Sequence, residues 1–441
     1  MLITFGVQRV VSANEKPQES KSKGPVITLE EAQRMIVANN PTFRNVQETV
    51  VQANSMIQSA WSMLLPNLSA KGSIIRNQQE VTMSFPTDWS TMPPATTEMV
   101  IQDLWAKSFG FSANITLLNP RAFPLIKLAY DINEQTKLRA MISKNDLLFA
   151  VTAAYYQIGS LKELMAVSQE TLETAREFER NAQARVTVGQ ATRIDLLRAQ
   201  LEVKRCEKDL GNVIDTHDMA KQSLAYLIGL EGEFSTVDPT DISPVSEAVD
   251  TLKERAMKER LEVQEAALQE KIAQRSRRET QMKWLPTFDL TYNWNWNSAA
   301  GFSGQNDSWM LIFGAKWSLL EGGGRLAQLK ERGSKIRMAQ NSLAQLFLDI
   351  RKEVDQNYKQ VKKQQRNVDL TAQQVLMAEE NHRMVTRQYE VGMASSLDVL
   401  NATTTLSNTR NSEIIERLNL DIATLTLRKS VGEYASLATK E

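Results

Sequence analysis

The stretch VGQATRIDLL at residues 188–197 returns as VGMASSLDVL at residues 391–400. A second stretch, MLLPNL at residues 63–68, returns as KWLPTF at residues 283–288, at a nearly constant offset. Each copy reads, in order, as helix, strand, long loop, strand, very long helix, turn and helix. The chain is therefore an internal two-fold repeat, with an element order that no soluble globular core needs.

Two segments are too long and too regular for a compact domain. Between Arg121 and Thr187 the only glycine is Gly159, and apolar residues recur at three- and four-residue spacing. From Arg325 to Glu390, apolar residues recur at seven-residue steps with one skip, which predicts a left-handed coiled-coil seam. These are Ile336, Leu343, Ile350, Val361, Val368 and Val375. A helix of about 66 residues is about 100 Å long. Shorter helices are expected over residues 28–64, 192–229, 247–284 and 395–432.

The segments that flank the loops alternate between apolar and polar residues. Residues 287–297 read TFDLTYNWNWN, and residues 308–319 continue the same alternation in the second copy. In the first copy, residues 108–117 alternate clearly and residues 68–75 weakly. About ten alternating residues are the length that a tilted strand needs to cross a bilayer. The aromatic residues that we expect to face lipid are Phe109, Phe111, Tyr292, Trp294, Trp296, Trp309, Phe313 and Trp317.

Two isolated hairpins of this kind cannot close a barrel around a lumen. An open sheet edge in lipid leaves backbone groups unpaired, at a cost of several kcal/mol each. Three chains would supply 12 strands, an even number that is wide enough for a channel. The alternative is a half-buried sheet in a soluble sandwich. In a barrel, the long loop at residues 77–107 would lie outside the cell, and the short loop is at residues 298–307.

The remaining composition excludes several classes of function. The 52 basic and 52 acidic residues balance, so net charge does not indicate nucleic acid as a partner. Cys206 is the only cysteine, which rules out a disulfide within one chain. His217 and His382 lack neighbouring metal ligands, and no phosphate loop, dinucleotide fingerprint or nucleophile elbow occurs. We therefore expect no enzyme activity, no cofactor and no metal site.

The N-terminal segment has two interpretations. Residues 1–7 are mostly apolar, and Val11-Ser12-Ala13 resembles a cleavage site for a signal peptide, but no basic residue precedes the apolar run. The segment is compatible with a clipped signal peptide or with a disordered tail. Residues 14–25 have the composition of a polar linker.

From about Ile27 to Tyr434 the chain resembles the TolC family of trimeric outer-membrane channels, which serve efflux pumps and type I secretion systems. The most specific match is YEVG at residues 389–392 followed by LDVLNATTTL at residues 397–406. The resemblance implies a mixed α and β membrane protein, a homotrimer with a 12-stranded transmembrane barrel in the outer membrane of a Gram-negative bacterium. Below the barrel, a tunnel of α-helical coiled coils would cross the periplasm. The partners would be outer-membrane lipid, a periplasmic adaptor and an inner-membrane transporter.

These observations predict the following division of the chain. The repeats occupy residues 27–230 and 247–434, joined by a linker at residues 231–246 in the equatorial region of the family's fold, with tails at residues 1–26 and 435–441. The barrel hairpins occupy residues 67–118 and 287–319. The tip turns occupy residues 188–192 and 391–395.

Each tip turn is followed by a pattern that starts a helix. Thr192 precedes Asp195 by three residues, and Ser395 precedes Asp398 in the same way, so both pairs match a capping box. The family resemblance gives these aspartates a second role that is compatible with capping. Asp398 matches a residue that lines the closed constriction, and Asp195 matches one that holds the two helical hairpins together.

The constriction is expected to hold one acidic ring. Asn401 stands where the family has a second aspartate, and Arg198 is a further candidate beside Asp195. Three Asp398 carboxylates around a three-fold axis would repel one another, which would raise their pKa values and attract cations. By family analogy, the candidates for docking an adaptor are the tip residues Val188, Gly189, Gln190, Ala191, Val391, Gly392, Met393, Ala394 and Ser395.

Two functions follow from this reading. The first is a passive, gated export duct of a tripartite efflux pump or a type I secretion system. The second is a periplasmic coiled-coil adaptor or scaffold without a channel. Adaptors also have long helical hairpins, but they lack paired amphipathic strands of ten residues flanked by Trp, so the strands favour the duct.

Overall fold

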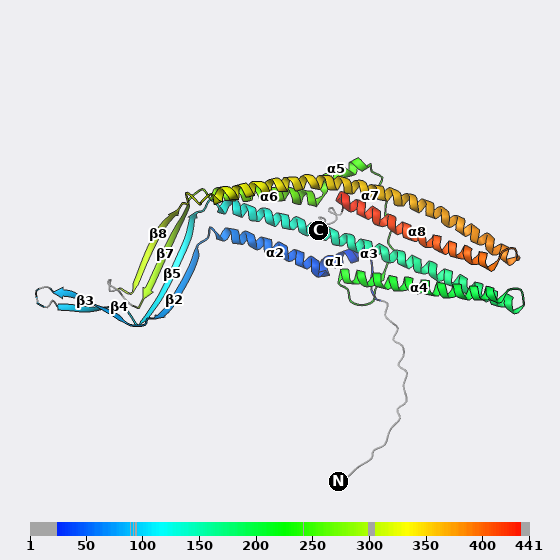
Figure 1. The fold of residues 1–441 in the computed structure, drawn as a ribbon, viewed down its shortest axis with the longest axis horizontal. Coiled ribbons are helices and arrows are strands. Elements are labelled where there is room, and N and C mark those ends of the chain that lie inside the picture. The colour runs from blue at the N-terminus through cyan, green and yellow to red at the C-terminus, as the bar shows by residue number, and fades with distance from the viewer. Residues whose placement is uncertain are drawn as a thin grey trace, which may run out of the picture. The chain divides into compact units, whose positions relative to one another are not determined.

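The structure is a computed structural model that describes residues 24–88, 90, 92, 95–240, 242–298 and 305–433 (Figure 1). The expected signal segment and most of the polar linker after it lie outside the described residues, as does the C-terminal tail. The chain forms two compact units, each of which takes segments from both repeats. The hairpin unit comprises Met1–Asn39, Val151–Asp241 and Thr371–Leu418, and the sheet unit comprises Asn40–Ala150, Ile242–Leu370 and Asn419–Glu441.

The sheet unit contains one antiparallel sheet of four strands. The strands are β2 (Asn67–Arg76), β5 (Trp105–Leu118), β7 (Thr287–Asn297) and β8 (Asp307–Lys316), in the spatial order β2-β5-β7-β8 (Figure 1). The expectation of two isolated hairpins is wrong, because β5 of the first repeat pairs with β7 of the second along almost its whole length. Both outer strands of this sheet, β2 and β8, have one edge without a partner strand in the described residues.

The register of the sheet separates an aromatic face from a polar face. Phe111 lies opposite Trp294, which lies opposite Trp309 on the next strand, and Phe109 lies opposite Trp296. The rings of Tyr292 and Trp309 stack with centroids 6.3 Å apart. Both side chains are exposed, as a sheet that faces a bilayer requires. One shared register therefore places the aromatic side chains of three strands together.

The opposite face carries polar pairs that bridge neighbouring strands. The Ser69 and Ser112 hydroxyl oxygens are 2.7 Å apart, as are those of Ser73 and Ser108. The Asn114 amide donates to the Thr291 hydroxyl over 2.6 Å. The predicted polar face is thus present on β2, β5 and β7, whereas β8 places Met310 and Ile312 on that face.

The alternation predicted that Trp317 belongs to a strand, but in the structure it lies just after one. β8 ends at Lys316, and the Trp317 indole N–H donates to the backbone carbonyl of Trp284 over 3.0 Å. This bond ties the residue after β8 to the helix end before β7. Trp317 therefore marks the junction between sheet and helices, with 61% of its surface exposed.

The long loop contains two strands that its prolines and polar residues did not predict. Within residues 77–107, β3 (Val81–Asp88) and β4 (Ala95–Gln102) form a separate two-stranded antiparallel sheet. Both strands are rich in Thr, Val, Met and Ile, which suit a strand, and Pro86 is tolerated because β3 is an edge strand. The prediction of a long loop over residues 77–107 did not include this pair of strands.

The two longest helices follow the predicted pattern closely. α3 spans Ala122–Thr187 with 66 residues, and α7 spans Gly324–Glu390 with 67 residues. Each is followed by a helix of 36 residues, α4 (Arg193–Ile228) and α8 (Ser396–Val431). None of the helices in the described residues combines the length and the hydropathy needed to cross a membrane.

Two helices that we expected to be continuous are each divided in two. Residues 28–64 form α1 (Leu29–Asn39) and α2 (Pro41–Ser62), because Asn40 caps α2 by accepting from the Thr42 N–H over 2.8 Å and Pro41 cannot continue α1. Residues 247–284 form α5 (Val249–Glu259) and α6 (Leu261–Met282), since Arg260 is extended with ψ of 128°.

Each unit has its own apolar core. In the sheet unit, Leu252 of α5, Ile350 and Val354 of α7, and Leu427 and Val431 of α8 are buried together. In the hairpin unit, Leu172, Ala175, Val203 and Cys206 pack between α3 and α4. Burial raises the pKa of the Cys206 thiol to about 11, and the nearby Glu202 and Asp209 carboxylates add to this effect. Of the predicted heptad residues, Ile350, Val361 and Val375 are buried and the others are half-buried.

The N-terminal end of the described chain is fixed within the hairpin unit. β1 (Val26–Ile27) pairs in parallel with β6 (Ser235–Thr236). The hydroxyl oxygen of the buried Tyr155 lies 2.7 Å from the Val237 carbonyl oxygen and 3.0 Å from that of Ile27. A side chain of α3 therefore anchors both short strands.

The sheet-unit core predicts a clear effect of truncation. We expect Ile350→Ala to lower the free energy of unfolding by about 2–5 kcal/mol, because it removes buried methyl groups and leaves a cavity. Urea denaturation in detergent, followed by circular dichroism, measures the change. Gln356→Ala on the exposed side of the same helix serves as the control and should change the value by less than about 0.5 kcal/mol. Equal effects of the two changes would contradict the assigned core.

Candidate functional site

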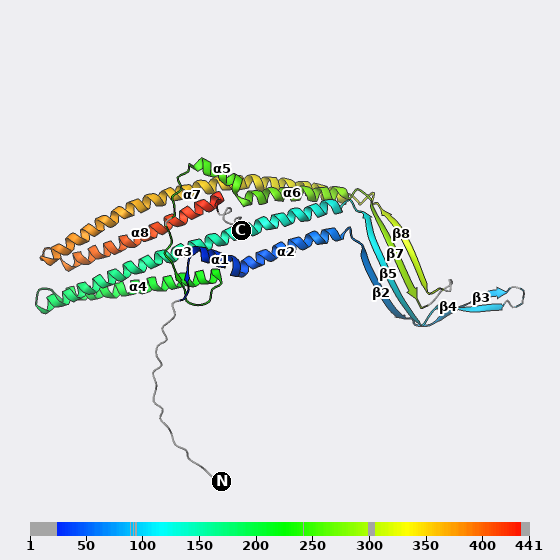
Figure 2. The ribbon, with the colours of Figure 1, turned by 180° about the vertical axis from the view of Figure 1, so that it is seen from behind.

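The candidate site is the pair of turns that end the long helices of the hairpin unit. Figures 1 and 2 agree that α4 returns alongside the last part of α3, and α8 alongside the last part of α7. Gly189 and Gly392 sit in the turns with φ of 75° and 78°, a left-handed conformation that glycine adopts at little cost. The Gln190 N–H donates to the Arg185 carbonyl over 2.8 Å, and the Met393 N–H donates to the Gln388 carbonyl over 2.7 Å. The two copies thus build the same turn.

Both predicted capping boxes are present. The Thr192 hydroxyl donates to Asp195 Oδ2 over 2.7 Å, and the Asp195 N–H donates back to Thr192 Oγ1 over 3.3 Å. The Ser395 hydroxyl and N–H donate to Asp398 Oδ2 over 2.6 and 2.8 Å. The hydroxyl bond from Ser395, with a smaller contribution from its N–H, holds the pKa of Asp398 below its usual value in the single chain. The rise that we expect from three neighbouring carboxylates requires the trimer and stays a prediction.

Asp195 also joins one hairpin to the other. The Ser396 hydroxyl, on α8, donates to Asp195 Oδ1 on α4, so both carboxylate oxygens of Asp195 are hydrogen-bonded. Arg198 lies on the same side, with Nη1 3.9 Å from Oδ1. The hydrogen bond from Ser396 lowers the pKa of Asp195 the most, and the bonds from Thr192 lower it further. Asp195 therefore remains a carboxylate at neutral pH.

A second contact between the hairpins lies on the long helices just before the turns. The Arg185 guanidinium stacks over the Tyr389 ring, 4.5 Å from its centroid, and Phe178 packs against the same ring at 5.5 Å. A cation over an aromatic face contributes about 0.5–2 kcal/mol, depending on its exposure. The bond from Ser396 to Asp195 thus connects α4 to the second hairpin, and the contact of Arg185 with Tyr389 connects α3 to it.

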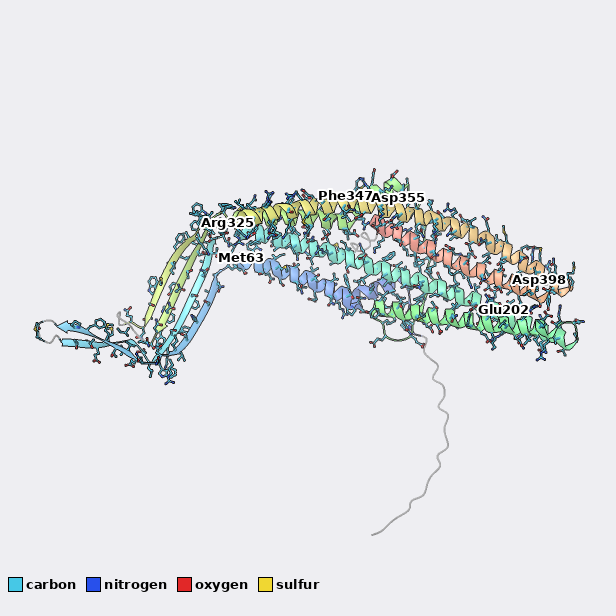
Figure 3. The ribbon with its side chains drawn as sticks, in the orientation of Figure 1. Met63, Glu202, Arg325, Phe347, Asp355 and Asp398 are labelled. Atoms are coloured by element: carbon cyan, nitrogen blue, oxygen red, sulfur yellow. The ribbon has the colours of Figure 1, made fainter. Side chains whose placement is uncertain are left out.

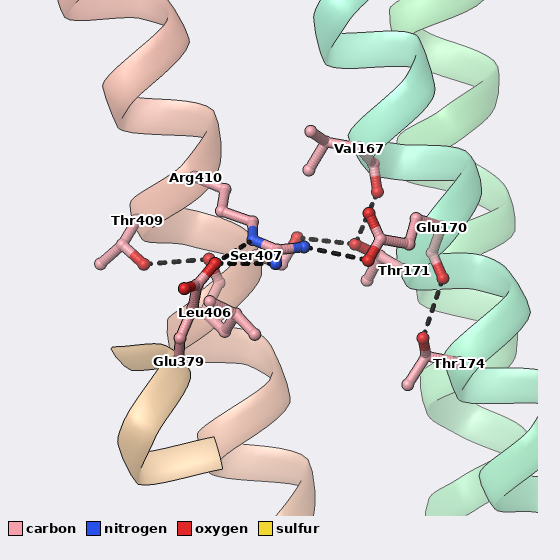
Figure 4. A network of polar contacts seen from close by, with 9 residues as sticks. All are labelled: Val167, Glu170, Thr171, Thr174, Glu379, Leu406, Ser407, Thr409 and Arg410. Carbon is pink, nitrogen blue, oxygen red and sulfur yellow. Dashed lines mark hydrogen bonds and ion pairs between the residues drawn. The ribbon is translucent and has the colours of Figure 1, made fainter. Parts of the chain in front are cut away.

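Further from the turns, Arg410 of α8 bridges the two long helices (Figure 4). Its guanidinium donates to Glu379 of α7 over 2.8 Å and to Glu170 of α3 over 3.1 Å. The bond to Glu379, opposed by partial burial, raises the pKa of Arg410. Nearby, the Thr171 hydroxyl lies 3.3 Å from the Ser407 hydroxyl.

The predicted constriction residues differ in what surrounds them. Asp398 is exposed near the turn (Figure 3), and within the described part of the chain its hydrogen bonds are with Ser395 of its own turn. Asn401 is exposed one helical turn further along α8. The structure thus brings Asp195 and Arg198 to the contact between hairpins and leaves Asp398 and Asn401 on an open helix face.

The tips themselves present apolar surface. Val188, Val391 and Met393 are 68%, 72% and 79% exposed. Gly189, Gln190, Gly392 and Ser395 are also exposed, and Ala191 and Ala394 are half-buried. Exposed apolar side chains at a helix end are compatible with docking of another protein.

Sequence reasoning missed the residues that connect the hairpins. Ser396, Arg185, Tyr389 and Arg410 were not among the candidates, although Tyr389 stood in the quoted motif. The doubled serine at residues 395–396 was a usable signal, because one serine suffices for the capping box and the second needs another partner.

A sequence profile of the outer membrane efflux protein family matches residues 33–230 and 252–433, which is most of the chain and both repeats. The chain belongs to the outer membrane efflux protein family. The resemblance drawn from the sequence is confirmed, and with it the location in the outer membrane and the role in efflux. A comparison with curated proteins found no match.

Several outer-membrane proteins with solved structures share the fold. VceC of Vibrio cholerae is 15% identical with a TM-score of 0.72, over 92% of this chain and 96% of that one. The CmeC outer-membrane channel of Campylobacter jejuni is 12% identical with a TM-score of 0.74. The match covers 97% of this chain and 94% of CmeC. The open state of the MtrE outer-membrane channel of Neisseria gonorrhoeae is 16% identical with a TM-score of 0.71, over 92% and 88%.

The bond between hairpins predicts a local and pH-dependent effect. We expect Ser396→Ala to lower the stability of the tips by about 2 kcal/mol at pH 7, because it removes a hydrogen bond to a carboxylate. Since the pKa of Asp195 is lowered, the difference in tip stability between the variant and the wild type is fully present above the usual aspartate pKa of about 3.9. It is lost as the pH falls through the lowered value.

Hydrogen exchange of the amides near the turns, read by mass spectrometry, measures this change. Ser412→Ala is the matched control, because the Ser412 hydroxyl donates to Asn408 of its own helix over 2.8 Å. Faster exchange in both variants, or in neither, would contradict a bond between hairpins through Ser396.

Proposed function

We propose that three copies of this chain form a 12-stranded barrel and a helical tunnel, and that the assembly works as a passive, gated export duct. The observation that carries the proposal is the four-stranded sheet, which has an exposed aromatic face and two edges that no strand of the described residues covers. In hydrocarbon, those edges require partner strands because no water can satisfy their backbone groups. A neighbouring copy supplies β8 for β2 and β2 for β8, so the sheet closes on itself.

The hairpin unit offers a second surface that suits neighbouring copies. On α7, Met377 and Met384 are seven residues apart and are 70% and 48% exposed, and Val391, seven residues further along in the turn, is 72% exposed. On α4, Ile194 and Leu201 are likewise seven residues apart and exposed. An apolar heptad line in water needs a partner helix. These lines support packing between hairpins of adjacent copies.

The assembly can be tested at this second surface. We expect Met377→Glu to weaken the trimer at least about tenfold, because a carboxylate would be desolvated in an apolar seam. Migration without heating in detergent electrophoresis, together with mass photometry, measures the trimer fraction. Gln374→Glu on α7 adds the same charge to another exposed position and should leave the trimer intact. A wild-type chain that stays monomeric and soluble without detergent would overturn the duct itself.

The gate lies at the tips in this proposal, with Asp398 and Asn401 at the constriction and Asp195 and Arg198 at the contact that holds the hairpins together. The exposed position of Asp398 supports a role towards the lumen, because its capping bonds use one carboxylate oxygen and leave the other open to solvent. Three such carboxylates would form a single acidic ring. Asn401 would add an uncharged ring about one helical turn away.

The acidic ring predicts the charge preference of the channel. We expect Asp398→Asn to lower the permeability ratio of K⁺ to Cl⁻ at least about twofold, and Asn401→Asp to raise it, since fixed carboxylates attract cations. Reversal potentials of bilayers under a KCl gradient measure the ratio. Thermal melting of the trimer is the control for capping. An unchanged ratio with a lower melting temperature would leave Asp398 with its capping role alone.

The duct would work with a periplasmic adaptor and an inner-membrane transporter, in a tripartite efflux pump or a type I secretion system. The apolar side chains Val188, Val391 and Met393 support docking of the adaptor at the tips. The second reading, an adaptor or scaffold without a channel, has no need of an aromatic sheet face. The cargo passes through without chemical change, so transport requires no catalytic group.

A further inference from the structure

The second repeat carries a concentration of positive charge that the first repeat lacks. Between Lys330 and Arg366, α7 has ten basic and four acidic residues. The equivalent stretch of the first repeat, residues 127–163, has five basic and four acidic residues. Because the whole chain is neutral, the excess on α7 is a local feature that neither the fold nor the repeat requires.

The excess charge lies on one exposed side of the helix. Seven of the ten basic residues are exposed and form no ion pair with any described residue: Lys330, Arg337, Arg351, Lys352, Lys362, Lys363 and Arg366. At about 100° per residue, all seven fall within an arc of about 120°. We call these seven residues the basic stripe. Asp355, labelled in Figure 3, is on the same side but is bonded to Lys359 and Lys253.

The opposite side of α7 is occupied. Ile350, Val354 and Val361 are buried there against α5 and α8. The basic stripe is therefore not a by-product of core packing, and it lies over about 54 Å of helix at 1.5 Å per residue. Five of the seven cations, from Arg351 to Arg366, lie within about 22 Å of helix. Most neighbours among these five are closer along the axis than the screening length of about 8–10 Å at physiological salt, and the longest gap is within two such lengths, so they act jointly on a polyanion.

We propose that the basic stripe binds the anionic, peptide-bearing glycan of the cell wall. This inference rests on the proposed function, since it requires α7 to stand in the periplasm beneath the barrel. The cell wall in that compartment is an extended polymer with many free carboxylates, whose charge is complementary to the basic stripe. A line of hydrated Lys and Arg side chains without a pocket suits a long, flexible polyanion, whereas a small anion would need a converging site.

The test uses the full-length trimer in detergent and protein-free cell-wall sacculi. The trimer should sediment with sacculi at low salt, and binding should fall steeply between 50 and about 300 mM salt. A stripe variant, K352Q, K362Q, K363Q and R366Q together, should bind at least about tenfold more weakly. The wild-type trimer should no longer sediment with sacculi whose carboxylates have been converted to neutral amides. That result would identify the carboxylates as the ligand.

A matched variant controls for total charge. K127Q, K137Q, K258Q and R278Q remove four exposed basic residues of the sheet unit that form no ion pair with described residues and lie outside α7. This variant should bind sacculi like the wild type. Equal binding by the stripe variant, or an equal loss in the control variant, would overturn the proposal.

Two further readouts separate the wall from other outcomes. Bilayer conductance of the stripe variant should match the wild type, so that a failure of the duct and a failure of wall binding are distinguishable. Loss of the trimer in the stripe variant would place the basic stripe between copies and overturn the proposal. Retention of the wild type by an acidic protein matrix but not by sacculi would overturn it in favour of a protein partner.

Discussion

The architecture depends on the need of backbone amides and carbonyls for hydrogen bonds where there is no water. Four strands per chain give a sheet with two open edges, and in a bilayer each open N–H and C=O would cost several kcal/mol. The aromatic face adds to this constraint, because its side chains are exposed and would be unfavourable in water. Closure by further copies pairs the open edges, and the hydrocarbon of the bilayer covers the aromatic face. The repeat supplies each chain's share, two strands from each copy.

The two tips show how one motif serves two purposes. Asp195 and Asp398 start equivalent helices with the same capping box, yet only Asp195 has both oxygens engaged. The difference is Ser396, which is buried and reaches across from the other hairpin. The repeat therefore keeps the local turn chemistry identical while one side chain assigns a connecting role to one aspartate and leaves the other exposed.

Much of this could be read from the sequence because the relevant periods are local. Alternation over residues 287–297 and the long helical segments predicted strands and helices within a few residues of those observed. The breaks at Asn40 and Arg260 were missed. The first has a readable signal in Asn40-Pro41, whereas Arg260 is extended through bonds that include Glu353, far away in the chain.

The pairing of strands between repeats could not be read from the sequence. Register between β5 and β7 depends on matching two faces more than 170 residues apart, as the Asn114–Thr291 bond illustrates. The bond between Ser396 and Asp195 is equally remote, and periodicity carries no information about it. Turn chemistry and amphipathic faces were thus predictable, while the partners of individual polar groups were not.

The environment of Cys206 has a practical consequence for labelling. With its pKa raised to about 11, the thiol is protonated at pH 7, and the thiolate is the form that reacts with maleimides and oxidants. The native protein is therefore a nearly silent background for thiol probes. A spin label or dye on a cysteine introduced at an exposed turn would report tip opening directly, without removal of the natural cysteine.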